Sequence, residues 1–292
     1  MSDIYKVNSD KIVGGPGRLV VKEYDGTFPD SISDVMNLSA PHDLVNGWRD
    51  LGSTNDGITT SRSFEEEEFE VDQQIGAVDS DITSWEHTLS TNLAENTIEN
   101  RQLSMIGGTI IETAPVLGTT TILTGAVVSG ATIINVTSAT GISKGQFIEI
   151  SEGSFIENHK VAKIQGNTIY LESPLQAPYS TTAVVAPVTQ LGTKRIGFGT
   201  PGVVPYKTYA LISKKKDGSL YMCVIRRAKV SGDAKEQVYG KEKRLIPLNL
   251  TAYPVDGEVA EENVYYEIEQ VLALGFPNPI LSSGICQLVG IS

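Results

Sequence analysis

The sequence predicts a mainly β protein with one flanking α-helix and a small all-β domain inserted into the main one. Segments rich in Thr, Val, Ile and Tyr alternate with Gly, Asn and Pro turns along most of the 292 residues. Only residues 93–105 combine a capping residue with apolar side chains at helical spacing. Residues 119–188 differ in composition from the rest of the chain and have turns about every 8–12 residues, which is typical of a separate sandwich or barrel.

Both ends of the chain are expected to be arms. Residues 1–47 are rich in Gly, Pro, Asp and Ser, so we expect an N-terminal arm or loop that leaves room for a short strand at residues 18–24. Residues 263–292 are expected to form a C-terminal arm. Its last part reads ICQLVGI over residues 285–291, and such an apolar segment is poorly suited to a monomer surface. We expect it to pair with a neighbouring copy or to pack on the body.

Residues 48–117 and 189–262 are expected to form one discontinuous β domain. Its first feature is the strong turn signal Asn-Asp-Gly at residues 55–57. Residues 58–71 then read as a long strand, because Thr and aromatic residues favour extended structure. Four consecutive Glu residues interrupt any apolar face, so we expect a bulge near them and acids that point to water.

Residues 84–93 alternate between two faces, which predicts a strand. The more apolar face holds Trp85, His87, Leu89, Thr91 and Leu93. A helix is predicted at residues 93–105, where Asn92 can act as the N-cap and Glu95 lies three residues further on. The glycines at 107–108 end this helix.

The inserted all-β domain is expected over residues 118–188. Its candidate strands are residues 131–137, 146–151, 155–164, 168–172 and 182–188. Beyond the insert, strands are predicted at residues 206–213 and 219–229, on either side of the lysine-rich turn 214–218. Residues 244–250 are expected to form a further strand.

Charge is unevenly distributed along the chain, whose net charge is −12. Residues 194–244 hold 13 Lys and Arg but only 4 Asp and Glu, a net of +9, and the other 241 residues carry −21. Segregated charge suits head-to-tail stacking of identical copies. The alternative is a chance segregation on solvated loops. Specific DNA binding is disfavoured, because a binder must neutralise phosphates.

Motifs for catalysis and for metal binding are missing. Residues 197–202 match G-x-G-x-x-G, but Pro201 and Pro205 prevent the helix that a dinucleotide site requires, so we interpret this segment as a loop. The sequence contains no nucleophile elbow, no P-loop and no C-x-x-C. The three histidines, His42, His87 and His159, lack the spacing of a zinc site. We therefore expect neither an enzyme, nor a cofactor, nor a metal site.

Two cysteines, Cys223 and Cys286, are too few for a disulfide scaffold, which favours synthesis in a reducing compartment. Cys223 lies in the apolar segment YMCVI and is expected to be a buried, inert thiol. No run of 18 or more apolar residues occurs, so no membrane span is expected. The first residues lack the basic and then apolar order of a secretory signal.

Several short blocks occur in a fixed order in the main domain. They read WRDLG, GIT, SRSFE, EVDQ, SWE and LSTNLAE between residues 48 and 95, and RRA, KRLIPL and YP between residues 226 and 254. In this order the blocks resemble bacteriophage tail tube proteins, the major tail proteins of long-tailed phages. The match covers roughly residues 48–112 and 194–256, in short weak blocks. The insert departs from the compact pattern of that family.

This resemblance implies a tail-tube-type β-barrel or sandwich with one flanking helix. It implies rings of six copies that stack into a tail tube and serve as a conduit for genome DNA, which passes without specific binding. The implied partners are other copies of the chain, the tape measure protein, the tail terminator and the distal tail proteins. The implied location is the virion tail, with assembly in the host cytoplasm.

Two sets of charged residues are candidates for this function. Glu66, Glu68, Glu70 and Asp72 are expected to share one face of a β-ribbon and to line the lumen, where they would repel DNA. Phe64 would lie at the margin of that face, while Phe69 and Val71 would point to the core. The expected inter-subunit contacts are Lys214, Lys215, Lys216, Arg226 and Arg227.

Two alternatives remain open at the sequence level. The acidic strand is equally consistent with the outside of a tube, where acids aid solubility. The chain as a whole is also consistent with a phage decoration or adhesion protein that binds a host glycan through the inserted domain. An enzyme such as a glycan hydrolase is the least supported reading, because no carboxylate pair stands out.

Overall fold

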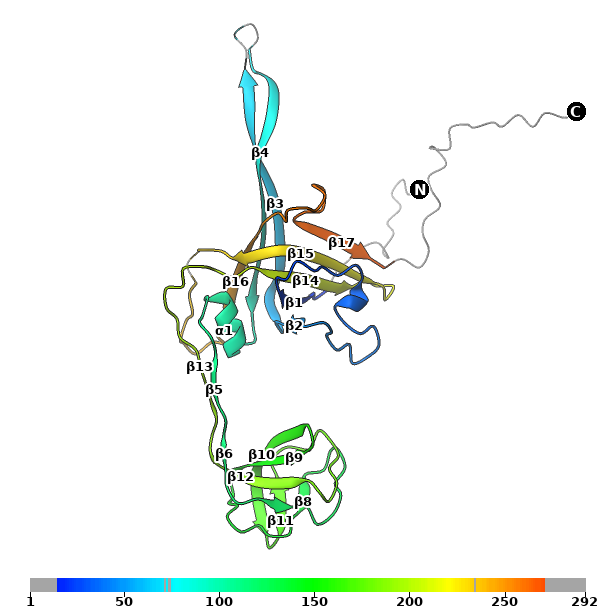
Figure 1. The fold of residues 1–292 in the computed structure, drawn as a ribbon, viewed down its shortest axis with the longest axis vertical. Coiled ribbons are helices and arrows are strands. Elements are labelled where there is room, and N and C mark those ends of the chain that lie inside the picture. Colours follow the sequence, from blue (N-terminus) through cyan, green and yellow to red (C-terminus); the bar gives the residue numbers. More distant parts are fainter. Residues whose placement is uncertain (1–14, 71, 73–74, 234, 271–292) are drawn as a thin grey trace, which may run out of the picture. The chain divides into compact units, whose positions relative to one another are not determined.

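The computed structural model describes residues 15–70, 72, 75–233 and 235–270. It divides the chain into two compact units, which are considered separately (Figure 1). Unit 1 consists of Met1–Gly108 and Phe198–Ser292, and unit 2 of Thr109–Gly197. In the described residues the protein is mainly β, with antiparallel sheets and one α-helix. Neither large sheet closes into a barrel in the described chain, so the expected barrel is not formed by one protomer.

Unit 1 is built on an eight-stranded sheet with the order β2-β1-β14-β15-β16-β4-β3, and β17 also pairs with β15. The strands are β1 (Arg18–Glu23), β2 (Arg49–Asp50), β3 (Thr54–Glu70), β4 (Ala77–Leu93), β14 (Lys207–Lys214), β15 (Leu220–Val230), β16 (Ile246–Ala252) and β17 (Tyr265–Glu269). The lysine-rich turn joins β14 to β15, as the sequence predicts. All pairings are antiparallel.

The short strand allowed at residues 18–24 within the predicted N-terminal arm is present as β1, and it is an inner strand of the sheet. It pairs with β14 on one side and β2 on the other. Leu19 and Val21 enter the core on one face, and Val20 enters the core on the opposite face, beside Ile32 of the short 3-10 helix η2 (Ile32–Asp34). These three consecutive apolar residues are typical of a strand that is covered on both faces.

The predicted C-terminal arm, residues 263–292, also begins inside the sheet. β17 pairs with the first half of β15, from Tyr221↔Glu269 to Ile225↔Tyr265. Residues 271–292 of this predicted arm lie outside the described part of the chain.

The helix α1 (Ile98–Ser104) is shorter than the predicted 93–105 and has a different cap. Thr97 is the N-cap, and its hydroxyl accepts a hydrogen bond from Asn100 N at 3.1 Å. Leu93 is instead the last residue of β4. The Glu95 carboxylate does not cap the helix but accepts a hydrogen bond from Ser53 N, just before β3, at 3.0 Å. A second capping residue, five positions downstream of Asn92, therefore sets the start of the helix.

Two further local predictions can be compared with β3 and β4. The predicted turn at residues 55–57 is a bulge inside β3, because the register shifts between Asn55 and Ile58 while Asp56 and Gly57 adopt positive φ. The predicted buried face of residues 84–93 is confirmed for His87, Leu89, Thr91 and Leu93. Trp85 departs from it and is 47% exposed.

Unit 2 is an all-β body with its own core. Its seven-stranded sheet has the order β6-β12-β9-β10-β11-β8, with β7 paired to β12. The strands are β6 (Val116–Leu117), β7 (Thr121–Ile122), β8 (Ile133–Asn135), β9 (Phe147–Glu152), β10 (Phe155–Gln165), β11 (Thr168–Leu171) and β12 (Val184–Gln190), and β5 (Ile111–Thr113) pairs with β13 (Thr193–Arg195). The five strands predicted for the insert correspond to β8–β12. Its core includes Ile134, Ile150 and Ile169.

Candidate interaction surfaces

The outer half of the β3–β4 hairpin is uncovered on both faces. Every described residue from 59 to 86 is exposed, and in this region β3 and β4 pair only with each other. Figure 1 shows the two strands leaving the body of unit 1 as a ribbon. A two-stranded ribbon is marginally stable alone in water. This hairpin therefore presents two faces and two strand edges to a potential partner.

The exposed hairpin combines strong negative charge with apolar side chains. Residues 60–88 contain nine Asp and Glu against the single base Arg62, a net of −8. The exposed apolar residues are Phe64, Phe69, Ile75, Val78, Ile82 and Trp85. Ile75, near the tip, is fully exposed at 102%. Apolar side chains gathered on one projecting element are typical of a surface that another molecule covers.

The predicted acidic face lies on this hairpin. Glu66, Glu68 and Glu70 occupy alternate positions of β3 and are exposed, and Asp72 is exposed beyond the strand. Their partners across the ribbon are Ile82, Ser80 and Ala77.

The prediction that Phe69 points to a core is wrong. Phe69 is 62% exposed and lies opposite Asp79, because no layer packs on either side of the ribbon in the described residues. Val71, predicted to point the same way, lies outside the described residues.

A row of rings runs from the hairpin into unit 1. Phe64 and Trp85 lie 4.9 Å apart between ring centroids, and the Arg62 guanidinium lies 4.2 Å from the Trp85 ring. His87 continues the row and meets Tyr265 of β17 at 5.4 Å. Burial, and then the nearby Arg62 charge, lower the pKa of His87, so its ring is neutral at pH 7.

The predicted basic contacts at the β14–β15 turn are partly engaged within unit 1. Lys214 and Lys216 are exposed, whereas the Lys215 side chain is largely buried and forms an ion pair with Glu269 of β17. Two of the three lysines thus present their charge to solvent, and the third joins the turn to β17.

Arg226 and Arg227 were also predicted as contact residues, and Arg226 is an internal residue of unit 1. Its side chain is 8% exposed, and its guanidinium lies 4.6 Å from the Phe28 ring and 4.5 Å from the Tyr266 ring. It forms ion pairs with Glu258 at 3.1 Å and Glu262 at 3.6 Å. Arg226 therefore attaches the segment between β16 and β17 to the sheet.

Arg227 is half-buried and is also bound within unit 1. It donates to the Pro254 carbonyl, and its guanidinium lies 5.1 Å from the Tyr206 ring. Of the five predicted contact residues, Lys214 and Lys216 are thus the most accessible.

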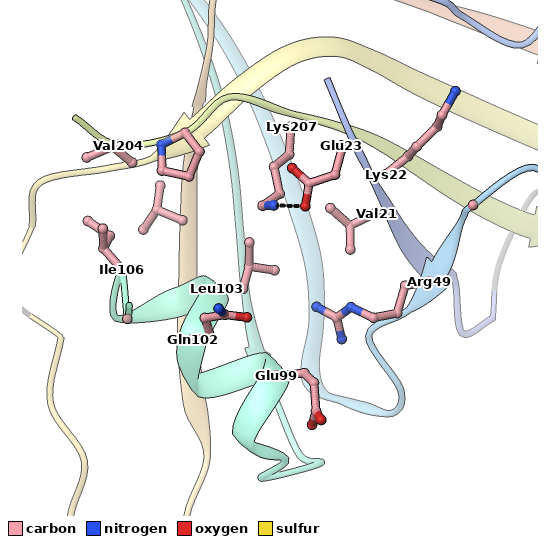
Figure 2. Close-up of a pocket in the computed structure, with 14 residues that line it drawn as sticks. Val21, Lys22, Glu23, Arg49, Glu99, Gln102, Leu103, Ile106, Val204 and Lys207 are labelled. Atoms are coloured by element: carbon pink, nitrogen blue, oxygen red, sulfur yellow. Dashed lines mark hydrogen bonds and ion pairs between the residues drawn. The ribbon is translucent and has the colours of Figure 1, made fainter. Parts of the chain in front are cut away.

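A recess of about 310 Å³ lies between α1 and the sheet of unit 1. Figure 2 shows Leu103 rising from α1 towards Val21, with the Glu23–Lys207 ion pair above it and Arg49 beside the helix. We call this hollow the α1 recess. One wall is apolar, and the other carries charged side chains.

Arg49 forms the charged wall of the α1 recess. Its Nη1 donates to Asn100 Oδ1 at 2.8 Å, and burial lowers the pKa of its guanidinium. The nearby Tyr209 hydroxyl is buried without a hydrogen-bond partner in the described structure, and burial raises the pKa of Tyr209. Sequence reasoning missed this recess, because it depends on contacts between residues some 50 positions apart.

The α1 recess lies at the base of the long hairpin. β2 directly precedes β3, and α1 follows β4, so both flank the end of the ribbon that is opposite to its tip. Figure 1 shows α1 and β2 at the end of unit 1 away from that tip. Unit 1 therefore has a projecting element at one end and a hollow at the other.

Unit 2 contains a polar cluster around the buried His159 that resembles a catalytic triad in composition. His159 lies 3.0 Å from Ser173 Oγ through Nδ1 and 2.8 Å from Glu157 Oε2 through Nε2. The Glu157 carboxylate also accepts from Gln176 N at 2.9 Å and Ala177 N at 2.7 Å. It therefore ties the loop after β11 to β10, which is a structural role.

The charged state of Glu157 is favoured by these bonds. Burial alone would raise its pKa, but hydrogen bonds from Gln176, His159 and Ala177 outweigh burial and lower the pKa of Glu157.

A scan against models of protein families found no match, and a search of curated proteins found none either. Within the described residues, no group of three or more His, Cys, Asp and Glu side chains is arranged to hold a metal ion. The same part of the chain contains no helix of sufficient length and apolar character to cross a membrane.

Proposed function

We propose that this chain is a structural virion protein that assembles with copies of itself into stacked rings, which form a phage tail tube. The observation that carries the proposal is the uncovered β3–β4 hairpin, whose exposed apolar residues and free edges suit a partner. The sequence blocks that resemble tail tube proteins supply the class of assembly. The charge segregation along the chain supports contacts between identical copies.

The position of the hairpin and the α1 recess favours head-to-tail contacts. A protruding element and a hollow on different surfaces form a heterologous contact, which generates rings or filaments instead of closed two-fold dimers. β3 is 17 residues long, so it extends about 55 Å and its tip reaches well beyond the body of unit 1. The tip of one copy is thus placed to meet the base of the next.

The acids of the hairpin suit a conduit for DNA. Phosphates are repelled by a surface that carries Glu66, Glu68 and Glu70 and no neighbouring Lys, so DNA would pass without adhesion. This lumen role belongs to the proposal, together with the virion tail as the location and the tape measure, tail terminator and distal tail proteins as partners.

Electron microscopy of the purified full chain tests the proposal. The wild type should form rings or tubes, and the variant Phe69→Ser/Ile82→Ser should remain unassembled, because both side chains are exposed in the protomer and available for contacts. The variant Val238→Ser/Val259→Ser removes exposed apolar residues elsewhere in unit 1 and serves as the matched control. A wild type that stays monomeric at all concentrations would contradict the proposal.

A further inference from the structure

The sheet of unit 1 forks where β16 and β17 meet β15. β15 pairs with β17 over Tyr221–Ile225 and with β16 over Ala228–Val230. The pairing continues from β16 to β4 and β3, but no described strand pairs with the other edge of β17. Figure 1 shows the β3–β4 ribbon and β17 diverging from β15. A cleft lies in this fork, and we call it the fork cleft.

The fork cleft has an apolar floor and two walls. It encloses about 190 Å³ above Cys223, Ile225 and Ala252. Thr60, Arg62 and His87 form the wall on the hairpin side, and Tyr265 and Glu267 form the wall on β17. An adjoining hollow of about 330 Å³ shares both walls and is also lined by residues 260–264, so the cleft continues past the start of β17.

Three features of the cleft are unsatisfied in the described residues. The Nδ1 atom of His87, whose ring is only 9% exposed, has no hydrogen-bond partner. The edge of β4 beyond His87 and the outer edge of β17 leave backbone groups without strand partners. Buried polar atoms and strand edges normally find partners. An extended segment with apolar side chains meets all three needs.

The described chain ends three residues beyond Glu267, which forms part of the cleft wall. Gln270 follows β17 directly, and its N–H donates to Leu220 O at 2.9 Å. The sequence beyond it, residues 271–292, contains no Asp, Glu, Lys or Arg and includes the apolar segment ICQLVGI at residues 285–291. These 22 residues extend to about 70 Å at most, several times the length of β17, and Gly275, Pro277 and Pro279 supply turn chemistry.

We propose that residues 271–292 dock in the fork cleft as an added strand along β17. An uncharged, apolar segment matches the Cys223 and Ile225 floor, and its backbone pairs with the free strand edge. This docking occurs within one protomer and does not depend on whether the protein forms tubes.

Hydrogen exchange on the full chain tests this docking. In the variant Leu281→Asp/Leu288→Asp, amides of residues 265–270 should exchange at least tenfold faster than in the wild type, because two buried charges would expel the segment. The control Asn278→Asp/Ser292→Asp adds the same charge at polar positions and should exchange like the wild type. Equal exchange in the wild type and the Leu variant would overturn the proposal. The exchange rates of the β1 amides serve as a control, because they should be unchanged if the sheet of unit 1 stays folded.

Photo-cross-linking of the native chain gives a second test. Cys286 of the tail is labelled with benzophenone maleimide, while Cys223 stays unreactive because burial raises its pKa to about 12. Cross-links mapped by mass spectrometry should fall on residues 58–62, 84–88 and 265–269. Cross-links confined to other strands would overturn the proposal.

Discussion

Phe69 of the β3–β4 hairpin and Phe155 of unit 2 are 62% and 64% exposed, yet the strands behind them differ. β10, which begins at Phe155, places Val161 in a core that also receives Ile150 from β9. The outer half of β3 contributes no described side chain to a core. The comparison shows that a strand pattern specifies extended structure, whereas a covering layer decides stability. Unit 2 supplies that layer itself, whereas the hairpin has no covering layer in the described residues and, under the proposed function, receives one from another copy.

The largest effect on stability is expected from a substitution in the core of unit 2. Ile150→Ala should lower the free energy of unfolding of unit 2 by about 2–5 kcal/mol, because a fully buried side chain leaves a cavity. This loss is measured by chemical denaturation that is monitored through the hydrogen exchange of amides in unit 2. The transition of unit 1 should be unchanged. A change below about 0.5 kcal/mol would remove the claim that unit 2 has its own tightly packed core.

A smaller effect is expected from the cap of α1. Thr97→Ala removes the acceptor for Asn100 N and should destabilise unit 1 by about 1 kcal/mol. Thr59→Ala, at an exposed position of β3, is the matched control and should have no measurable effect. Thermal unfolding of both variants provides the measurement. If the Thr97→Ala variant and the wild type unfold at the same temperature, Thr97 does not set the start of the helix.

Acid should destabilise unit 2 through Glu157. Because the folded-state pKa of Glu157 is lowered from its ordinary value of 4.5, its stabilising contribution is complete above that value and is lost as pH falls through the folded-state pKa. Glu157→Gln should flatten the dependence of unit 2 stability on pH below 4.5. Denaturation at a series of pH values measures the slope. An unchanged slope would contradict the assigned role of this carboxylate.

The smallest effect on stability and a clear effect on assembly are expected at the β14–β15 turn. Lys214→Glu/Lys216→Glu should leave the free energy of unfolding within about 0.5 kcal/mol, because both side chains are exposed. Assembly should require a higher protein concentration, and 1 M salt should weaken wild-type assembly by reducing the screening length to about 3 Å. Lys144→Glu/Lys163→Glu in unit 2 is the control. Light scattering that shows no difference between the two variants would exclude charge pairing at this turn.

Local patterns predicted residues 84–93 of β4 and the five strands β8–β12, because alternation along β4 and the turns of unit 2 are encoded by neighbouring residues. The inner position of β1 in the sheet could not be predicted, because its partner β14 lies far along the chain. The helix start was misplaced by two competing caps, Asn92 and Thr97. Exposure of Phe69 could not be predicted, since alternation does not say whether a second layer exists.

The candidate surfaces were only partly accessible to sequence reasoning. The acidic run that holds Glu66 and Glu68 is visible as composition, and so are the lysines of the β14–β15 turn. Burial of Arg226 between Phe28 and Tyr266 follows from long-range packing that no local pattern reveals. The α1 recess and the fork cleft arise in the same way, from elements that meet only in the folded sheet.

Hydroxyl-radical footprinting of the full chain, before and after assembly, tests whether another copy covers the β3–β4 hairpin. Phe69 and Phe155 have nearly equal exposure in the protomer, so their oxidation rates should be similar in unassembled protein. On assembly we expect at least fivefold protection of Phe69 and Trp85, because another copy would cover the hairpin, while Phe155 stays reactive. Assembled protein in which Phe69 and Trp85 are oxidised as fast as in the free protomer would show that the hairpin is not a contact between copies.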